Sequence, residues 1–245
     1  MNIVIPLAGK DPQFPNLPKP LIDAGGKPII AHVLEHLRIE PEDTLIFVVL
    51  QEDVEAYHIE EVLKRIAGGR AIVRVLPKMT QGSPCSILEA ARDLIDNDTD
   101  VLVDLGDVLR DTGQLYKDIS SHRANVSGII SVDRRDMTGH LWGYVQTDDK
   151  GRASALLEKE PAAMAPWATT GLYYFSHGKD LVWATEEMVK HKSFLYKDTF
   201  FVGPVYNELI TRGDAVVISK NTILVQLRGP EDVEQFIQSG ASGNA

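Results

Sequence analysis

Apolar positions along the chain follow two patterns, and each pattern predicts a different element. Short, nearly continuous apolar runs predict buried strands, whereas apolar residues that recur at every third or fourth position predict amphipathic helices. In the N-terminal part of the chain the two patterns alternate, which predicts right-handed βαβ crossovers and a mostly parallel sheet. The predicted strands are 3–7, 44–50, 71–76 and 101–103, and the predicted helices are 31–37, 54–67 and 83–95.

The C-terminal half has a less regular pattern, with short predicted strands that are joined by turns. These strands predict a small β subregion beside the main sheet. The fold class is therefore α/β: a Rossmann-like three-layer αβα sandwich with a mostly parallel central sheet and a small flanking β subregion. We expect one domain at 1–238 and a flexible tail at 239–245. The predicted strands here are 126–132, 143–147, 153–158 and 171–175, and the predicted helices are 180–190, 205–212 and 230–237.

Size and charge narrow the classes of function. A chain of 245 residues that is 44% hydrophobic can bury a full core as a single domain. Its 25 Lys and Arg against 35 Asp and Glu give a formal charge of −10, which argues against a nucleic acid as partner. The single cysteine, Cys85, excludes an intrachain disulfide, and no nearby histidine would activate its thiol. Met1 directly precedes the first strand and no apolar run approaches a membrane span, so we expect a cytoplasmic protein without a membrane partner.

The first thirty residues have the features of a phosphate site. The strand at 3–7 leads into a loop with Gly9, whose backbone amides can face an anion. Lys19 follows between two prolines, which restrict its backbone and aim its ammonium. Taken alone, this segment is equally compatible with an ordinary surface turn.

The wider motif carries a family resemblance. Residues 7–30 read LAGxxxxFxxxPKPLIxxxGKPII, which resembles the N-terminal signature of the sugar nucleotidyltransferases. These enzymes join a nucleoside triphosphate to a sugar 1-phosphate or a similar phosphomonoester and release pyrophosphate. The resemblance implies that Lys19 stabilises charge on the α-phosphate, and that Leu7, Ala8, Gly9 and Lys10 hold the nucleotide.

A second motif, Thr80-Gln81-Gly82-Ser83, lies between a predicted strand and a predicted helix. A glutamine amide can read the polar edge of a base, and a glycine lets the ring approach the backbone. In isolation this motif favours a loop with a helix cap, since Gly82-Ser83 caps well. The resemblance implies a nucleobase loop that contains Gln81, Gly82 and Ser83.

The apolar strand that begins at 101–103 ends in two carboxylates, Asp104 and Asp107. Mg²⁺ is usually held by one or two carboxylates together with substrate phosphates, and ligands of open α/β sheets collect at the carboxyl ends of strands. Gly106-Asp107 resembles the strand-end GD of the nucleotidyltransferases, which implies that Asp107 is a catalytic residue that binds Mg²⁺. Asp104 lies inside the strand and is alternatively a buried, hydrogen-bonded carboxylate. We expect Asp111 to cap the following helix.

A third set of motifs resembles the acceptor side of the same family. It consists of GYV from Gly143, the pair Glu158-Lys159 and a GxYxF strand after Thr170. The resemblance implies that Lys159 holds the acceptor phosphate, with the other three residues near the acceptor. Segments 201–210 and 229–232 resemble the branch found in capsule and surface-polysaccharide gene clusters, which favours CTP as the nucleotide.

The chain also departs from the family pattern. Asp11 and Gln13 stand where the second glycine and the arginine of GxGxR are expected, so the loop gains a carboxylate and loses a bidentate phosphate donor. Residues 225–230 lack the second metal aspartate that many relatives carry. These departures leave open a catalytically silent regulator that binds nucleotide sugars. A metal-dependent glycosyltransferase is disfavoured, because Asp104 and Asp107 do not form D-x-D.

The sequence motifs do not identify the acceptor. A hexose 1-phosphate, phosphocholine and phosphoglutamine are all compatible with the motifs.

Overall fold

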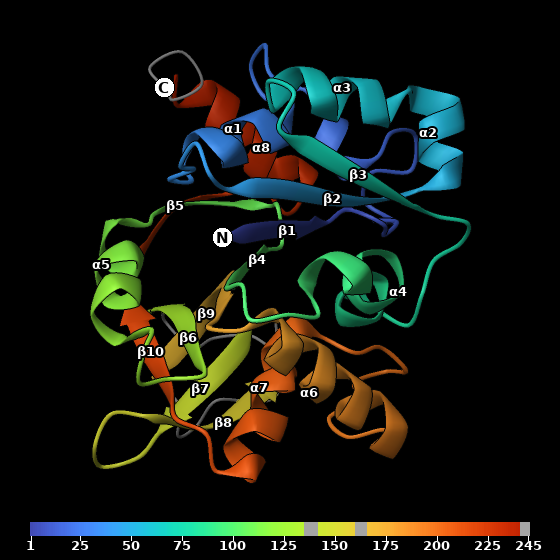
Figure 1. The fold of residues 1–245 in the computed structure, drawn as a ribbon. Helices are drawn as coiled ribbons and strands as arrows, with labels where there is room; N and C mark the ends of the chain where they lie inside the picture. Colours follow the sequence, from blue (N-terminus) through green and yellow to red (C-terminus); the bar gives the residue numbers. More distant parts are fainter. Residues whose placement is uncertain (135–141, 160–165, 241–245) are drawn as a thin grey trace.

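The computed structural model describes residues 1–134, 142–159 and 166–240. Its central sheet has the strand order β10-β6-β9-β4-β1-β2-β3, drawn in Figure 1. β9 runs antiparallel to both of its neighbours in this order, and the other pairings along it are parallel. The strands of this order are β1 (Asn2–Pro6), β2 (Thr44–Leu50), β3 (Ala71–Leu76), β4 (Val101–Asp104), β6 (Gly128–Asp133), β9 (Trp167–Phe175) and β10 (Val216–Lys220).

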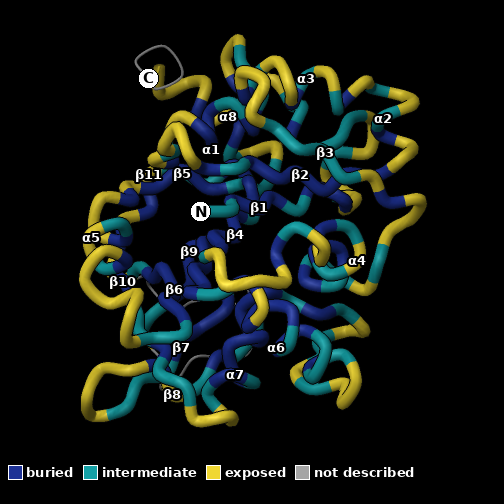
Figure 2. Tube along the Cα trace, viewed as in Figure 1, coloured by how far each residue is buried: buried dark blue, intermediate teal, exposed yellow. Residues whose placement is uncertain are grey.

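The side chains of strand β2 contribute alternately to two hydrophobic cores, one on each face of the sheet. Leu45 and Phe47 belong to one hydrophobic core, and Ile46 and Val48 belong to the other, because successive side chains point to opposite faces of a sheet. Figure 2 shows the central strands buried between the helical layers. The expected three-layer α/β fold is therefore confirmed. One layer holds α1 (Ile29–Glu35), α2 (Gln51–Tyr57), α3 (Ile59–Ile66), α5 (Gly113–His122) and α8 (Pro230–Gln238), and the other holds α4 (Ser83–Ile95), α6 (Gly178–His191) and α7 (Val202–Arg212).

The expected flanking β subregion is a hairpin of β7 (Gly143–Thr147) and β8 (Ala153–Glu158). β7 pairs with the start of β9, where Tyr144 lies opposite Ala168. A second, separate sheet pairs β5 (Val108–Asp111) with β11 (Thr222–Gln226). The sequence pattern did not predict β5, β10 or β11, and it implied α5 only through the cap expected at Asp111. The two strands of the separate sheet are only four and five residues long, and β5 contains an arginine.

The helix predicted at 54–67 is two helices, α2 and α3. His58 separates them with a left-handed backbone (φ 51°, ψ 35°). The apolar positions Val54, Ile59 and Leu63 recur at near-helical spacing along the sequence, and this recurrence does not show that a left-handed residue separates two helices.

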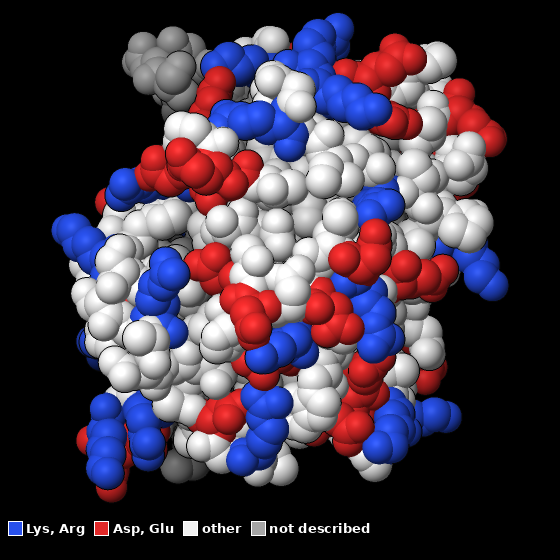
Figure 3. Space-filling model, in the orientation of Figure 1, with Lys and Arg blue, Asp and Glu red and all other residues white. Residues whose placement is uncertain are grey.

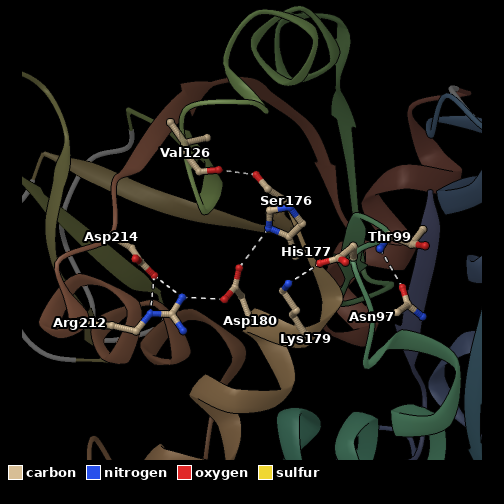
Figure 4. A network of polar contacts seen from close by, with 10 residues as sticks. Asn97, Thr99, Val126, Ser176, His177, Lys179, Asp180, Arg212 and Asp214 are labelled. Atoms are coloured by element: carbon tan, nitrogen blue, oxygen red, sulfur yellow. Dashed lines mark hydrogen bonds and ion pairs between the residues drawn. The ribbon is translucent and has the colours of Figure 1, made fainter.

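Polar contacts tie α6 to α7, as Figure 4 shows. Arg212, at the end of α7, donates from Nη2 to Asp180 of α6 at 2.6 Å and also pairs with Asp214. Nδ1 of His177 lies 3.3 Å from the same Asp180 carboxylate. The guanidinium of Arg212 also lies 4.1 Å from the ring centroid of Trp183. These contacts fix two helices of the same layer relative to each other.

The C-terminal helix α8 packs on α1 of the opposite end of the chain, where the rings of His32 and Phe236 meet edge to face at 5.0 Å. Ser239 follows α8, and the predicted tail lies outside the described residues from 241 onward. On the face drawn in Figure 3, acidic and basic side chains are interspersed. None of the helices within the described ranges is long and apolar enough to cross a bilayer.

Candidate active site

The two predicted catalytic residues, Lys19 and Asp107, come from segments that follow β1 and β4. These two strands are parallel neighbours, with Val4 opposite Val103. The loop after β1 and the turn after β4 therefore leave the sheet at the same edge, which is where open α/β sheets bind ligands.

Lys19 begins a short 3₁₀ helix, η1 (Lys19–Leu21), and Pro18 before it is extended (φ −54°, ψ 130°). Lys19 thus lies in a 3₁₀ helix, although the proline that follows it favours extended backbone at this position, and the restriction of its backbone stays a prediction. Its ammonium lies 2.9 Å from Oδ2 of Asp107 and 3.4 Å from Oδ2 of Asp11. The predicted catalytic cation and the predicted metal ligand are thus in direct contact.

A buried ion pair supports the turn that carries Asp107. Asp104 and Arg110 are both almost fully buried, and Arg110 donates from Nη1 to Asp104 Oδ2 at 2.6 Å. The other oxygen of Asp104 accepts the backbone N–H of Gly106 at 2.8 Å. Gly106 is left-handed (φ 77°), a conformation that favours glycine. Asp104 is therefore the buried, hydrogen-bonded carboxylate of the alternative interpretation, and it holds the turn from behind.

Oδ1 of Asp111 accepts a hydrogen bond from the backbone N–H of Gly113, the first residue of α5, at 2.9 Å. This agrees with the expected contribution of Asp111 to the start of a helix, although Thr112 occupies the N-cap position itself.

The nucleobase loop turns sharply at Gly82, whose φ is 126°. A Cβ at this position would lie 2.1 Å from the carbonyl oxygen of Phe200, so the backbones of the two segments approach as closely as glycine permits. Gln81 is exposed, and its carbonyl accepts the N–H of Phe200 at 2.8 Å. Ser83, the first residue of α4, faces the same cavity as Asp107. The loop is thus held against the segment before α7.

A cavity of about 100 Å³ joins the Asp107 turn to the predicted acceptor residues. All four predicted acceptor residues line it. Its lining comprises Ser83, Leu105, Asp107, Val108, Trp142, Gly143, Glu158, Lys159, Thr169, Thr170, Gly171, Tyr173, Phe201, Val202 and Arg228.

Glu158 and Lys159 have distinct environments in this cavity. Burial raises the pKa of the Glu158 carboxyl to about 7, against the smaller opposing effects of Lys159 and Arg228. Lys159 has a left-handed backbone (φ 55°), and its ammonium lies 4.6 Å from the ring centroid of Phe201. A cation and a readily neutralised acid therefore lie side by side at the end of β8.

Gly143 and Thr170 line the cavity in different ways. A Cβ at Gly143 would lie 2.8 Å from Oε2 of Glu158, so the glycine makes room for that carboxyl. The hydroxyl of Thr170 is buried and donates to Ser131 at 2.6 Å, so this contact would have to break before the hydroxyl could donate to an acceptor.

The structure separates the predicted nucleotide residues of the first loop. Leu7 is buried, and its N–H extends the sheet by donating to Val48 at 2.7 Å, so this amide is not available to a phosphate. Ala8 is also buried, whereas Gly9 and Lys10 are exposed. Gly9 and Lys10 line a second cavity of about 290 Å³ between the loop and α2.

The ammonium of Lys10 pairs with Glu52 of α2 at 2.7 Å. It therefore faces α2 rather than the Lys19–Asp107 pair. The positive charge that Lys10 adds to the altered loop is partly neutralised in this arrangement.

Sequence reasoning assigned no role to Arg228 or Trp142. Arg228 lies beyond β11, with its Nε 4.0 Å from Oδ2 of Asp107 and its guanidinium 4.8 Å from the ring centroid of Trp142. The sequence did offer one indication that Arg228 lies in the site. Residue 228 falls within the segment 225–230, where many relatives carry a metal-binding aspartate. The buried Arg110 left no signal of this kind, because an arginine in a short strand resembles any exposed polar residue.

Asp107 fits the role of a ligand to a divalent cation, since one carboxylate together with substrate phosphates and water can hold Mg²⁺. Within the described ranges, no group of three or more His, Cys, Asp and Glu side chains is arranged to hold a metal. Lys19 and Arg228 already flank the carboxylate. Any ion held there would rely mainly on the substrate for its remaining ligands.

Comparisons with known proteins show the family of this chain. The sequence profile of the family described as Nucleotidyl transferase matches residues 15–200, which is more than half of the chain. The chain belongs to this nucleotidyl transferase family.

Among curated proteins, the bifunctional protein GlmU of Cupriavidus taiwanensis is 29% identical over 175 residues, which cover 67% of this chain and 35% of that protein. GlmU of Syntrophomonas wolfei is 28% identical over 166 residues, which cover 66% of this chain and 35% of that protein. The chain thus spans about a third of the length of these relatives.

Solved structures share the fold along almost the whole chain. The nucleoside-diphosphate-sugar pyrophosphorylase of Vibrio cholerae RC9 superposes with a TM-score of 0.81 at 21% identity and covers 97% of this chain and 100% of its own. A putative glucose-1-phosphate thymidylyltransferase of Bacillus anthracis gives a TM-score of 0.76 at 14% identity, with 97% and 94% covered. A UDP-glucose pyrophosphorylase complexed with UDP-glucose gives 0.74 at 16% identity, with 98% of both chains covered.

Proposed function

We propose that this chain transfers a nucleotidyl group from a nucleoside triphosphate to a phosphorylated small-molecule acceptor and releases pyrophosphate. The observation that carries the proposal is the contact between Lys19 and Asp107 beside a cavity that also contains Lys159. Cations and a carboxylate from three separate segments meet there, as a reaction between two phosphorylated substrates requires.

In the proposed reaction, an oxygen of the acceptor phosphate attacks the α-phosphorus of the triphosphate. A new phosphorus–oxygen bond forms on the α-phosphorus, the bond to the bridging oxygen breaks, and pyrophosphate leaves with the electron pair. Such a transfer depends on positioning and on neutralising charge.

Each residue has a part in this scheme. Lys19 stabilises the negative charge that develops around the α-phosphorus, and Lys159 leaves the ring of Phe201 to orient the acceptor phosphate. Gly9 and its neighbours contact the triphosphate, and Gln81 with Gly82 contacts the base. Members of this family typically use a divalent cation. We propose Mg²⁺ held by Asp107, which would neutralise phosphate charge.

We further propose CTP as the nucleotide and a precursor of surface polysaccharide as the product. This choice is supported by the resemblance of segments 201–210 and 229–232 to the capsule branch. UTP and dTTP are the competing choices, because solved relatives are described as UDP-glucose and thymidylyl enzymes.

The deciding experiment is pyrophosphate release by the purified chain with Mg²⁺. Each of CTP, UTP, dTTP, ATP and GTP is paired with glucose 1-phosphate, glucosamine 1-phosphate, N-acetylglucosamine 1-phosphate, phosphocholine or phosphoglutamine. We expect release with one nucleotide that depends strictly on the acceptor. Release with no pair would contradict the proposal.

A second candidate function is binding of a nucleotide sugar without turnover. It is favoured by Asp11, whose carboxylate lies 3.4 Å from the ammonium of Lys19 and repels a triphosphate in the altered loop. A chain that binds nucleotide sugars in calorimetry but releases no pyrophosphate from any pair would establish this function instead.

A further inference from the structure

Arg228 occupies a defined place at the rim of the acceptor cavity. Its backbone N–H donates to Oδ2 of Asp232 at 3.0 Å, and the N–H of Gly229 donates to the same oxygen at 3.0 Å. The start of α8 therefore holds the backbone of Arg228. The guanidinium lies over Trp142 at 4.8 Å, a stacking arrangement that restricts the side chain further.

The loop that carries Gln13 adjoins this segment. A Cβ at Gly229 would lie 2.9 Å from Oε1 of Gln13, so the side chain of Gln13 already touches the residue next to Arg228. The segment that carries Arg228 thus lies beside the loop that contains Asp11 and Gln13, although the two segments come from opposite ends of the chain.

The charges around Arg228 favour an anionic ligand. Lys19 and Arg228 share the carboxylate of Asp107, at 2.9 and 4.0 Å, and Lys159 lines the same cavity. Two of these cations thus lie near Asp107, and Lys19 also lies 3.4 Å from the carboxylate of Asp11. A diphosphate that binds here would compete with these carboxylates for the cationic side chains. Glu158, the other acid that lines this cavity, is half-buried, and desolvation raises the pKa of its carboxyl.

We propose that Arg228 binds the diphosphate group of the nucleotide sugar or of pyrophosphate, and that this group binds without a divalent cation. An arginine presents several N–H donors in a planar fork that matches two phosphate oxygens. Arg228 neutralises at Asp107 part of the charge that a metal ion would neutralise. The step of nucleotidyl transfer keeps its own requirement for the metal. The inference rests on the proposed function only in taking a diphosphate as the ligand.

Inorganic pyrophosphate is the probe, because it carries the diphosphate without a base or a sugar. It is titrated by calorimetry into the full chain with EDTA and, separately, with Mg²⁺. We expect the unmodified chain to bind in EDTA, and Arg228→Gln to bind roughly ten- to hundredfold more weakly there, as the loss of a charge-assisted contact of about 1.5 to 3 kcal/mol implies. Arg228→Gln should regain part of its affinity in Mg²⁺.

Arg92→Gln is the matched control. Arg92 lies in the last turn of α4 and pairs with Glu186 on the surface, so this variant changes the net charge equally and should bind like the unmodified chain. Tryptophan fluorescence gives a second readout, since displacement of the guanidinium over Trp142 should change the emission, and Trp142→Phe should remove that change.

Equal affinity of Arg228→Gln and the unmodified chain in EDTA would overturn the inference, as would binding that requires Mg²⁺ in the unmodified chain. If Arg228→Gln fails to fold, Arg228→Lys decides: it keeps the charge without the fork, and an affinity loss of less than about threefold would contradict the role of the guanidinium. Because no nucleotide or acceptor is present, failure of turnover in the pyrophosphate-release assay leaves this result unaffected.

Discussion

The ammonium of Lys19 lies 2.9 Å from Oδ2 of Asp107, although 88 positions separate the two residues in the chain. A phosphate that enters the site must compete with this carboxylate for the lysine, and a metal ion must compete with the lysine for the carboxylate. Binding of the proposed metal–nucleotide complex would resolve both competitions at once, since it would bring an anion to Lys19 and a cation to Asp107.

Replacing Lys19 by alanine should abolish turnover. The ammonium is the cation that we place at the α-phosphorus, whereas a partly exposed ion pair contributes roughly 1 kcal/mol or less to stability. Initial rates and melting curves measure the two effects. Lys64→Ala, which removes an exposed lysine paired with Glu60 on α3, should keep both properties. Turnover above about a tenth of the unmodified rate would exclude Lys19 as the catalytic cation.

Asp107→Asn should weaken binding of the Mg²⁺–nucleotide complex and remove metal-dependent turnover. Binding of the nucleotide in EDTA should change less, because the amide keeps the size of the side chain but loses its charge. Calorimetry with and without Mg²⁺ separates these effects. Asp93→Asn on the surface of α4, where Asp93 pairs with Arg74, serves as the control. Unchanged affinity for the Mg²⁺ complex would mean that another group holds the metal.

Gly82→Ala should lower both nucleotide affinity and stability. Its Cβ would lie 2.1 Å from the backbone oxygen of Phe200, so one of the two segments must move, and φ of 126° is unfavourable for alanine. We expect a loss of roughly 1 to 3 kcal/mol in the free energy of unfolding. Gly68→Ala is the matched control, since Gly68 also has a positive φ (63°) but open space around it. Equal losses in the two variants would show that backbone strain alone is responsible.

Glu158 should make stability depend on pH. Its pKa rises from 4.5 to about 7 on folding, so the folded chain keeps a proton that the unfolded chain releases. The free energy of unfolding should therefore fall as pH rises from about 4.5 to about 7, and the loss should be complete above that window.

Glu158→Gln lacks this effect and should become more stable relative to the unmodified chain by up to about 3 kcal/mol between pH 4.5 and pH 8. Urea unfolding at several pH values measures the difference. Glu89→Gln, at an exposed position of α4, controls for loss of a carboxylate elsewhere. A stability difference between Glu158→Gln and the unmodified chain that stays constant with pH would contradict the raised pKa.

Restoring the family pattern with Asp11→Gly and Gln13→Arg should raise triphosphate affinity. The change removes a carboxylate 3.4 Å from Lys19 and adds a bidentate phosphate donor, for a gain of roughly ten- to hundredfold before any cost of a more flexible loop. Affinities of both proteins for nucleoside triphosphates and for nucleotide sugars test this. No gain for any triphosphate, together with weaker binding of a nucleotide sugar, would favour the binding function without turnover.

Local patterns in the sequence were enough to predict much of this protein. The buried strand β2 and the strand end that is followed by Asp107 depend on neighbouring residues along the chain. Such features follow from side-chain periodicity and backbone sterics, which act over a few residues. The tertiary structure decided which distant groups share a site.

Arg228 meets Asp107 because β11 pairs with β5, and Lys10 turns to Glu52 because α2 lies beside the first loop. The burial that raises the pKa of Glu158 likewise arises from the packing of the flanking hairpin against the sheet. These contacts depend on strand order and on segments that are remote in sequence. The periodicity of apolar residues cannot predict such contacts, because they form only when the layers pack together.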